Sequence, residues 1–338
     1  SCASQTVSDR SFQRPAAPIA IKPSVQTCTT FGHEFSLRAL EIAAAGGHHV
    51  LFKGPPGCGK TMLARRLPSI LPALSQAEAV EVTRVQSITG LLRTDGLVGQ
   101  RPFRAPHHSI SASGLTGGGR TPMPGEVTLA TNGVLFLDEL AEFSTRTLES
   151  LRQPLEAGSI SVTRGQRTFE YPARFMLVAA TNPCPCGAGD RRCRCSAAEV
   201  ARYERRLSGP LLDRFDMHCR VDRPTPAEVE AGPVTDSATV RDRVELARER
   251  QARRYEALDA FCNGQMDGAQ TRRLLEPPDA VRLQLGEAYR NGALSLRGYD
   301  RALRVARTIA DLDDRAVIDE ADMAEALAFR AVDTTLAA

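Results

Sequence analysis

Residues Gly54 to Thr61 read GPPGCGKT, which matches the pattern G-x-x-x-x-G-K-[ST]. The apolar residues His49 to Lys53 predict a short buried strand before this loop, and Lys60 to Leu67 predict a helix after it. A loop in that position wraps backbone N–H groups around a phosphate at the helix N-terminus. The Lys60 ammonium then reaches the β- and γ-phosphate oxygens, and the Thr61 hydroxyl binds Mg²⁺. The stretch therefore predicts a site for ATP and Mg²⁺.

The candidate nucleotide-binding residues are the loop, the residue after it and one acid from a later strand: Gly54, Pro55, Pro56, Gly57, Cys58, Gly59, Lys60, Thr61, Met62 and Asp138. Cys58 fills a variable position of the pattern. This cysteine is interpreted either as a spacer or as a thiol that the helix N-terminus makes open to oxidation.

A second apolar run, GVLFLDE from Gly133 to Glu139, predicts a buried strand that ends in two acids. Ligands of open α/β sheets bind at the carboxyl ends of the strands. We therefore expect Asp138 to hold Mg²⁺ and Glu139 to orient or deprotonate the attacking water. Adjacent acids at a strand end are often merely solvated, and the loop at Gly54 to Thr61 favours the catalytic interpretation.

Residues Arg174 to Thr181 predict the next buried strand, and Asn182 follows it directly. A neutral polar side chain there can contact the γ-phosphate and the catalytic water, so Asn182 is a candidate sensor residue. Thr-Asn-Pro is also an ordinary turn signal. The order of the strands favours the sensor.

Arg214 belongs to the segment SGPLLDRFD, which precedes another strand-like run. An arginine on a subunit edge can reach the γ-phosphate of a neighbouring subunit and stabilise the charge of the transition state. A local ion pair with Asp213 or Asp216 is the alternative. Arg297 lies in the first turn of a predicted helix that buries a stripe of Leu303, Ala306 and Ile309.

Four of the nine cysteines form the pattern C-x-C-x₆-C-x-C: Cys184, Cys186, Cys193 and Cys195. Four thiolates are enough to bind one tetrahedral Zn²⁺. The spacing differs from the familiar C-x-x-C pairs, so reduced thiols, a disulfide and an iron–sulfur role stay open as alternatives. His107 and His108 are another pair of metal-ligand types, for which loop structure or DNA contact is the favoured interpretation.

Strands alternate with helices over residues 31–225, which predicts an α/β core with a parallel sheet flanked by helices. Further elements are predicted in this core: helices at 34–47, 75–88 and 144–157, a helix stop at Pro68, a long functional loop or insertion at 89–125, and a hairpin at 159–172. The Pro-rich segment 223–237 predicts a domain boundary. Helices at 240–258, 278–290, 297–311 and 318–330 then predict an all-helical lid over residues 237–333.

The composition is that of an ordinary globular protein. The chain has 338 residues, of which 42% are hydrophobic, and a net charge of +3, which neither indicates nor excludes nucleic acid. No stretch approaches the roughly 18 to 20 apolar residues of a membrane span, and the first residues lack the apolar core of a signal peptide. We therefore expect no membrane partner and a cytoplasmic location. Residues 1–30 are rich in Ser, Thr and Pro and predict a flexible tail or linker.

Several longer strings of the sequence, in addition to the phosphate loop, are similar to those of a known family. They include RALEIAAAGGHH, GPPGCGKTMLAR, RPFRAPHHSIS, PGEVTLATNGVLFLDEL, LRQPLE, NPCPCG, RLSGPLLDRFD and RVARTIADL. Together they resemble the AAA+ ATPases of the magnesium-chelatase-like ComM (YifB) family over residues 31 to 333. The resemblance implies an AAA+ core with a helical lid, ATP hydrolysis and a homo-hexameric ring that assembles with nucleotide. It also implies movement on single-stranded or branched DNA, as a helicase of branch migration in recombination and natural transformation.

The resemblance also implies roles for particular residues. Arg214 is similar to the arginine finger of the family and Arg297 to its second sensor on the lid. Two hairpins of related motors point into the pore of the ring, so Arg120, Arg164 and Arg167 are candidates for contact with DNA phosphates.

Family members carry an amino-terminal domain similar in fold to the Lon protease domain. Residues 1–30 take its place in this sequence, so we expect either a fragment or a protein without that domain. Two other functions stay open: a magnesium-chelatase motor subunit that acts on a protein partner, and a nucleotide-gated scaffold without catalysis.

Overall fold

The computed structural model describes residues 34–93, 95–118, 123–164, 167–189, 192–207, 209–230, 236–256, 260 and 262–330. The predicted tail at 1–30 lies outside these ranges. None of the helices in the described part of the chain combines the length and the apolar character that a membrane crossing requires.

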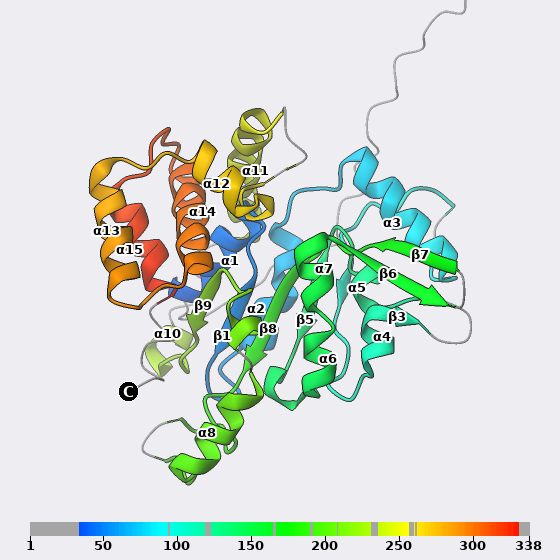
Figure 1. The fold of residues 1–338 in the computed structure, drawn as a ribbon, viewed down its shortest axis with the longest axis horizontal. Helices are drawn as coiled ribbons and strands as arrows, with labels where there is room; N and C mark the ends of the chain where they lie inside the picture. Colours follow the sequence, from blue (N-terminus) through cyan, green and yellow to red (C-terminus); the bar gives the residue numbers. More distant parts are fainter. Residues whose placement is uncertain are drawn as a thin grey trace, which may run out of the picture.

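A five-stranded sheet in which all neighbouring strands are parallel forms the centre of the molecule (Figure 1). The order across the sheet is β2 (Phe103–Arg104), β5 (Val134–Leu137), β8 (Met176–Thr181), β1 (Val50–Lys53) and β9 (Met217–Arg220). Val50 is in register with Val178 of β8 and Met217 of β9. The carboxyl ends of the strands therefore share one edge, where ligands of such sheets bind.

Alternate side chains of each strand enter two apolar cores on opposite faces of the sheet. Val50 and Phe52 of β1 face a core that includes α1 (Glu34–Gly46) and α2 (Lys60–Ile70), whereas Leu51 faces the other core. Because helices cover both faces, the strands are continuous apolar runs, as the sequence predicts. The fold class predicted from the sequence is confirmed.

The second core includes residues of short helices: α4 (Ala112–Thr116), α5 (Glu126–Leu129), η1 (Leu140–Glu142), α6 (Thr145–Glu149) and α7 (Arg152–Ala157). Around α4 and α5 lie α3 (Gln76–Ile88) and the paired strands β3 (Gly117–Gly118) and β4 (Met123–Pro124). The capping box predicted for α3 is present, because Ser75 and Glu78 each accept a hydrogen bond from the other's backbone N–H. The segment predicted as a loop or insertion contains β2, the edge strand of the main sheet. Two residues are too few for an alternating pattern, so the sequence did not indicate this strand.

Two predicted helix boundaries are wrong, and both involve proline. α2 continues through Pro68 to Ile70, because the Leu71 N–H still bonds to the Leu67 carbonyl at 3.1 Å after the proline. The helix predicted over 144–157 is split into α6 and α7. Pro154 has no N–H for the carbonyl of Ser150, so the hydrogen-bond ladder is interrupted there.

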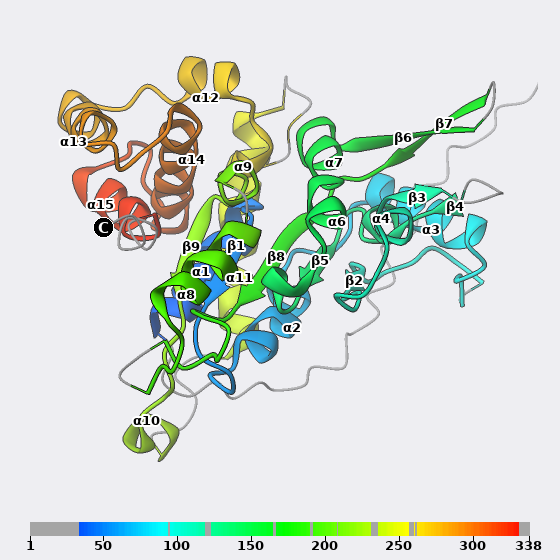
Figure 2. The same cartoon turned by 60° about the horizontal axis from the view of Figure 1, so that its bottom comes forward.

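The predicted hairpin consists of β6 (Ser159–Arg164) and β7 (Arg167–Pro172). Its strands pair in antiparallel register from Ser159 and Pro172 up to Arg164 and Arg167. The hairpin and the carboxyl-terminal helices lie at opposite ends of the molecule, as two views show (Figure 1 and Figure 2).

Helices make up the chain after β9: α10 (Pro226–Glu230), α11 (Ser237–Arg254), η2 (Asn263–Gln265), α12 (Gly268–Leu274), α13 (Asp279–Arg290), α14 (Leu296–Leu312) and α15 (Glu320–Ala328). The four predicted helices correspond to α11, α13, α14 and α15. The sequence did not predict the short helices α10, which lies within the segment predicted as a domain boundary, and α12. The predicted stripe of Leu303, Ala306 and Ile309 is buried. It belongs to the same apolar core as Val50 and Phe52, so the helical region packs directly on α1 and α2.

A buried histidine connects this helical region to the sheet. His48 precedes β1, is 0% exposed, and its Nε2 lies 2.7 Å from the Thr308 hydroxyl of α14. Burial lowers the pKa of His48 below its ordinary value, and Arg304 and Arg248 act in the same direction, against the opposing effect of Asp216. The folded protein therefore favours the neutral imidazole.

This shift predicts loss of stability in mild acid. A histidine whose pKa is lower in the folded state than in the unfolded state, where it is near 6.5, favours folding fully at a pH above 6.5. This contribution is lost as the pH falls below 6.5, because the unfolded chain then binds a proton that the folded chain does not. We expect the free energy of unfolding to fall as the pH goes from 7 to 5, by at most about 1.4 kcal/mol per pH unit for one group, and the urea midpoint to fall with it. Urea titrations of the wild type and of His48→Gln would measure this, with the exposed His107→Gln as the matched control. Equal pH dependence in the wild type and His48→Gln would contradict the prediction.

Candidate nucleotide-binding site

The predicted phosphate loop connects β1 to α2 at the carboxyl edge of the sheet. Gly57 and Gly59 adopt left-handed backbone angles, with φ of 76° and 94°. Position 54 requires glycine for another reason: the Cβ of any other residue would lie 2.0 Å from the Val221 carbonyl oxygen. The loop therefore turns tightly against the end of β9 and leads into the N-terminus of α2, where anions bind.

Lys60 and Asn182 meet in this loop. The Lys60 Nζ is buried and donates to the carbonyls of Gly54 at 2.6 Å and Pro55 at 2.8 Å. It also donates to the Asn182 Oδ1 at 3.2 Å. The structure thus places the candidate sensor beside the candidate phosphate-binding lysine, although they are far apart in the sequence.

Thr61 and Asp138 form a second contact at the same edge. The Thr61 hydroxyl donates to the Asp138 Oδ2 at 2.7 Å. A hydroxyl and a carboxylate side by side are the hard oxygen donors that Mg²⁺ prefers, so these residues fit the predicted metal. Met62 follows on α2 and is 41% exposed.

Glu139 follows Asp138 in a left-handed conformation, with φ of 53°. Its carboxylate lies 3.3 Å from His108 Nδ1, and the His108 ring packs on His107 at 4.0 Å between centroids. The sequence did not indicate this contact, because its two partners are 31 positions apart and no pattern connects them. A non-glycine residue with positive φ next to a candidate metal ligand is typical of a functional site.

Arg214 and Arg297 lie together, but away from the phosphate loop. Arg214 follows α9 (Gly209–Leu212), is 6% exposed, and donates to Glu156 of α7 and to the Pro210 carbonyl. Arg297 Nη2 lies 3.8 Å from the same Glu156 oxygen. Glu156 is thus the partner of Arg214, rather than the acids near it in sequence. Burial lowers the pKa of Arg214, and its Nε has no hydrogen-bond partner in the described part of the chain.

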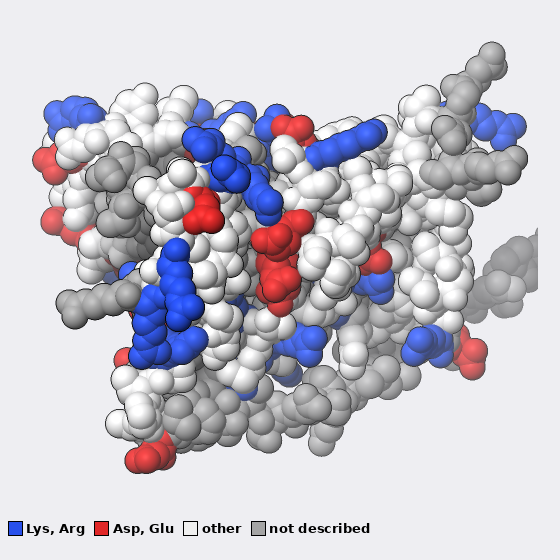
Figure 3. Space-filling view, turned by 90° about the horizontal axis from the view of Figure 1, so that it is seen from below, with Lys and Arg blue, Asp and Glu red and all other residues white. Residues whose placement is uncertain are grey.

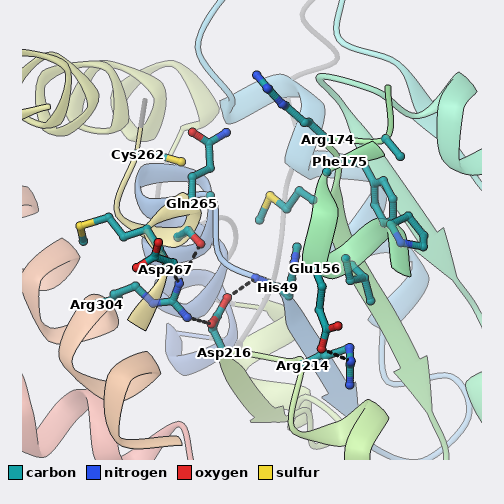
Figure 4. A pocket seen from close by; sticks show the side chains of 18 of the residues that line it. His49, Glu156, Arg174, Phe175, Arg214, Asp216, Cys262, Gln265, Asp267 and Arg304 are labelled. Atoms are coloured by element: carbon teal, nitrogen blue, oxygen red, sulfur yellow. Dashed lines mark hydrogen bonds and ion pairs between the residues drawn. The ribbon is translucent and has the colours of Figure 1, made fainter. Parts of the chain in front are cut away.

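Both arginines line a cleft of about 510 Å³ between the core and the helical region (Figure 4). Figure 4 shows Arg214 and Glu156 pointing toward one another on one side of the cleft, and Asp216 with Arg304 on the other. None of the residues of the phosphate loop lines this cleft. Within one chain, the candidate residues therefore form two separate groups.

The four cysteines come together as predicted. Their sulfur atoms all lie within 4.8 Å of one another, and Cys184 is 3.4 Å from Cys186 and 3.6 Å from Cys193. Four sulfurs around one zinc with bonds of about 2.3 Å lie about 3.8 Å apart, so the cluster fits a zinc site. The thiols are free rather than joined in disulfides. Among the described residues this is the group of three or more His, Cys, Asp or Glu side chains that lie close enough to share a metal ion, and His107 and His108 belong to no such group.

The cysteine cluster and α8 (Ala197–Arg206) touch three parts of the nucleotide-binding edge. Gly187 packs against Pro56 of the loop so closely that an added Cβ would lie 2.8 Å from its ring. The Tyr203 hydroxyl of α8 lies 3.4 Å from that of Thr181, next to Asn182. Arg206 donates to the Ala141 carbonyl in η1, just after Glu139.

The candidate DNA-contacting arginines are only partly described. Arg167 is exposed on β7. Arg164 lies at the end of β6, but its side chain, like the whole of Arg120, lies outside the described residues.

The fold and the grouped residues define a P-loop nucleotide-binding protein with an AAA+ core. Two family models match the chain, magnesium chelatase subunit ChlI over residues 28–229 and the ChlI C-terminal region over 234–330. The chain belongs to this magnesium chelatase family, which confirms the resemblance inferred from its motifs.

Two relatives are nearly half identical to it. The uncharacterized protein YifB of Escherichia coli is 45% identical over 333 residues, which cover 96% of this chain and 64% of that protein. The competence protein ComM of Haemophilus influenzae is 45% identical over 315 residues, 92% of this chain and 61% of ComM. The magnesium-chelatase subunit ChlI of Nephroselmis olivacea is 24% identical over 81% of this chain. The chain thus spans less than two thirds of the length of YifB and ComM.

Proposed function

We propose that this chain hydrolyses ATP at the interfaces of a homo-oligomeric ring, with a hexamer as the expected form, and that hydrolysis drives movement on DNA. The observation that carries the proposal is the separation of the candidate residues into two groups. The phosphate loop, Asp138, Glu139 and Asn182 meet at the carboxyl edge of the sheet. Arg214 and Arg297 meet elsewhere, in a cleft that excludes the loop.

The sheet itself sets the distance between these groups. Arg214 precedes β9, whereas the loop packs against Val221 at the far end of that strand. A four-residue strand spans about 13 Å. An arginine at one end of β9 is thus poorly placed for its own loop, and a ring would bring it to the loop of the next copy.

The residues of one copy then have separate tasks. The loop N–H groups and Lys60 bind the phosphates, which replace the Gly54 and Pro55 carbonyls as stronger acceptors for the ammonium. Thr61 and Asp138 would hold Mg²⁺, which when bound offsets the charge of the phosphate oxygens. Glu139, oriented by His108, activates the attacking water, and Asn182 contacts the γ-phosphate. Arg214 and Arg297 of the neighbour stabilise the charge of the transition state.

The DNA part of the proposal has two supports. One is the 45% identity to the competence protein ComM, against 24% to the chelatase subunit. The other is the distribution of charge, because basic residues gather in patches beside an acidic strip on the face in Figure 3. Concentrated positive charge attracts polyanions although the net charge is small. Arg167 on the projecting hairpin is a candidate phosphate contact.

The four-cysteine cluster adds a structural role to the proposal. Cys184, Cys186, Cys193 and Cys195 would bind one Zn²⁺, which when bound cross-links the segment between Asn182 and Arg214. Gly187 and Tyr203 connect that segment to the loop and to the sensor strand. The cluster therefore holds the sensor and the finger segment in a fixed relation.

Substitution of the general base tests the motor. We expect single-stranded or branched DNA to stimulate the ATPase rate of the wild type, and Glu139→Gln to lower that rate roughly 10²-fold or more while ATP still binds. The amide keeps the shape of Glu139 but cannot accept the proton of water. Glu149→Gln, an exposed glutamate paired with Arg152, is the matched control and should hydrolyse normally. Hydrolysis without DNA stimulation would instead favour a protein partner, and absence of hydrolysis in the wild type would favour a scaffold.

Loss of two thiols tests the zinc role. In Cys193→Ser/Cys195→Ser we expect the zinc content to fall from about one ion per chain to almost none, with a parallel fall in ATPase rate. Metal analysis and a phosphate-release assay measure the two quantities. Cys219→Ser/Cys262→Ser, at two buried cysteines outside the cluster, should retain zinc. A zinc-free protein with unchanged ATPase would refute the coupling.

A further inference from the structure

We infer that Asp216 is a positioning residue, which locks the segment that carries Arg214 to the helix that carries Arg297, so that one subunit presents both arginines as a unit. The inference rests on the proposed function, because it concerns the arginines that would act on a neighbour's nucleotide. It assigns a task to a buried acid that the proposed chemistry does not otherwise use.

The Asp216 carboxylate joins the core to the helical region. It is 3% exposed and accepts a hydrogen bond from the His49 N–H at 2.9 Å, at the start of β1. On its other side lie Arg301 Nε at 3.1 Å and Arg304 Nη2 at 3.4 Å, both on α14. A buried carboxylate is costly unless it is paired, so the loss of either arginine would leave an uncompensated charge in the interior.

The charge of Asp216 is retained. Burial opposes ionisation, but the contact with His48 and the charges of Arg304 and Arg301 outweigh it and hold the pKa of Asp216 well below its ordinary value. Near neutral pH, the carboxylate therefore attracts both arginines of α14.

Helix geometry transmits this contact to Arg297. Positions 297, 301 and 304 are separated by four and three residues, which places them on one face of α14. Fixing Arg301 and Arg304 against the core thus fixes the rotation of the helix about its axis. Arg297, one turn before Arg301, is directed by the same constraint toward Glu156 and Arg214.

The segment on the core side is equally constrained. Phe215, between Arg214 and Asp216, is 0% exposed. The Arg330 Nη1 donates to the Phe215 carbonyl at 3.0 Å and to the Asp216 carbonyl at 3.3 Å. Arg214 is therefore attached to a backbone that cannot shift without disturbing Asp216, and through it α14.

A second buried aspartate provides a matched comparison. Asp311 is 0% exposed and pairs with Arg254 and Arg307, so it resembles Asp216 in burial and in having two arginine partners. It also accepts a hydrogen bond from the Asn263 Nδ2 at 3.0 Å, and these partners belong to α11, η2 and α14, all within the helical region. If both aspartates only stabilise the fold, their substitution should change the ATPase rate to a similar extent. If Asp216 positions the arginines, only its substitution should impair the site that two neighbouring subunits share.

Mixed oligomers separate these possibilities. Asp216→Asn should lower the ATPase rate of the pure protein by about 10- to 100-fold through misplacement of the arginines. The Asp216→Asn protein should then be mixed with an equal amount of Glu139→Gln protein. At an interface between the two, the intact phosphate loop and Glu139 of the first protein would face the correctly placed arginines of the second. Random mixing then allows recovery to at most about a quarter of the wild-type rate. Asp311→Asn should hydrolyse near the wild-type rate and gain nothing from mixing.

Arg214→Ala, mixed with Glu139→Gln in the same way, tests the shared site itself. No recovery in that mixture would overturn the proposed interface and the inference with it. If the ATPase rate recovers in the Arg214→Ala mixture but not in the Asp216→Asn mixture, only the inference about Asp216 is overturned. A wild-type ATPase rate in the pure Asp216→Asn protein would overturn it as well. Should Asp216→Asn fail to fold, Arg301→Met keeps the apolar stem and removes the same ion pair. We expect it to show the same recovery, and a lack of recovery would count equally against the inference.

Discussion

The parallel register of β5, β8 and β1 is the constraint on which the candidate site depends. Leu137 is paired with Ala179, and Lys53 with Thr181, so the three strands end at one edge of the sheet. The residues that follow them are the phosphate loop, Asp138 and Asn182. The contacts of Lys60 with Asn182 and of Thr61 with Asp138 are consequences of this register. A slip of one residue in any strand would turn its side chains to the other core and separate these partners.

The opposite edge of the same sheet carries the second group of residues. His48 and Asp216 precede β1 and β9, and both contact α14. The helical region is therefore attached at the amino ends of these strands, and its Arg297 lines a cleft that the phosphate loop of the same chain does not line. In the isolated chain Glu156 pairs with both Arg214 and Arg297, and its single negative charge offsets only one of the two positive charges. The two edges together explain why the candidate residues are divided between two surfaces.

The sequence allowed prediction of those features that depend on local pattern. The loop at Gly54, the capping box of α3 and the hairpin at Ser159–Pro172 have short-range signals, and all are present. The continuous apolar strands indicated a sheet covered on both faces. Contacts that depend on tertiary packing were not predictable. The two-residue strand β2, the contact of His108 with Glu139 and the pairing of Arg214 with Glu156 bring together residues that no period or motif relates. Proline is a strong local signal for the end of a helix, but its effect depends on its exact position in the helical turn. Helix α2 therefore continues through Pro68, and Pro154 lies inside α7.

The cysteine cluster lies in the part of the chain between Asn182 and Arg214. That stretch leaves the carboxyl edge of the sheet after β8 and reaches the amino end of β9, so it spans both groups of candidate residues. Along the way it contacts the loop at Pro56, the end of β8 at Thr181 and the turn after Glu139. A flexible connection would let each of these contacts change separately. The proposed Zn²⁺ would cross-link the four thiols, which lie within 4.8 Å of one another, and so join the start and the middle of the connection. The capping box of α8, between Ser196 and Glu199, orders the start of that helix. With that cross-link in place, we expect a displacement at the nucleotide edge to be carried to the segment of Arg214 instead of being absorbed in the connection.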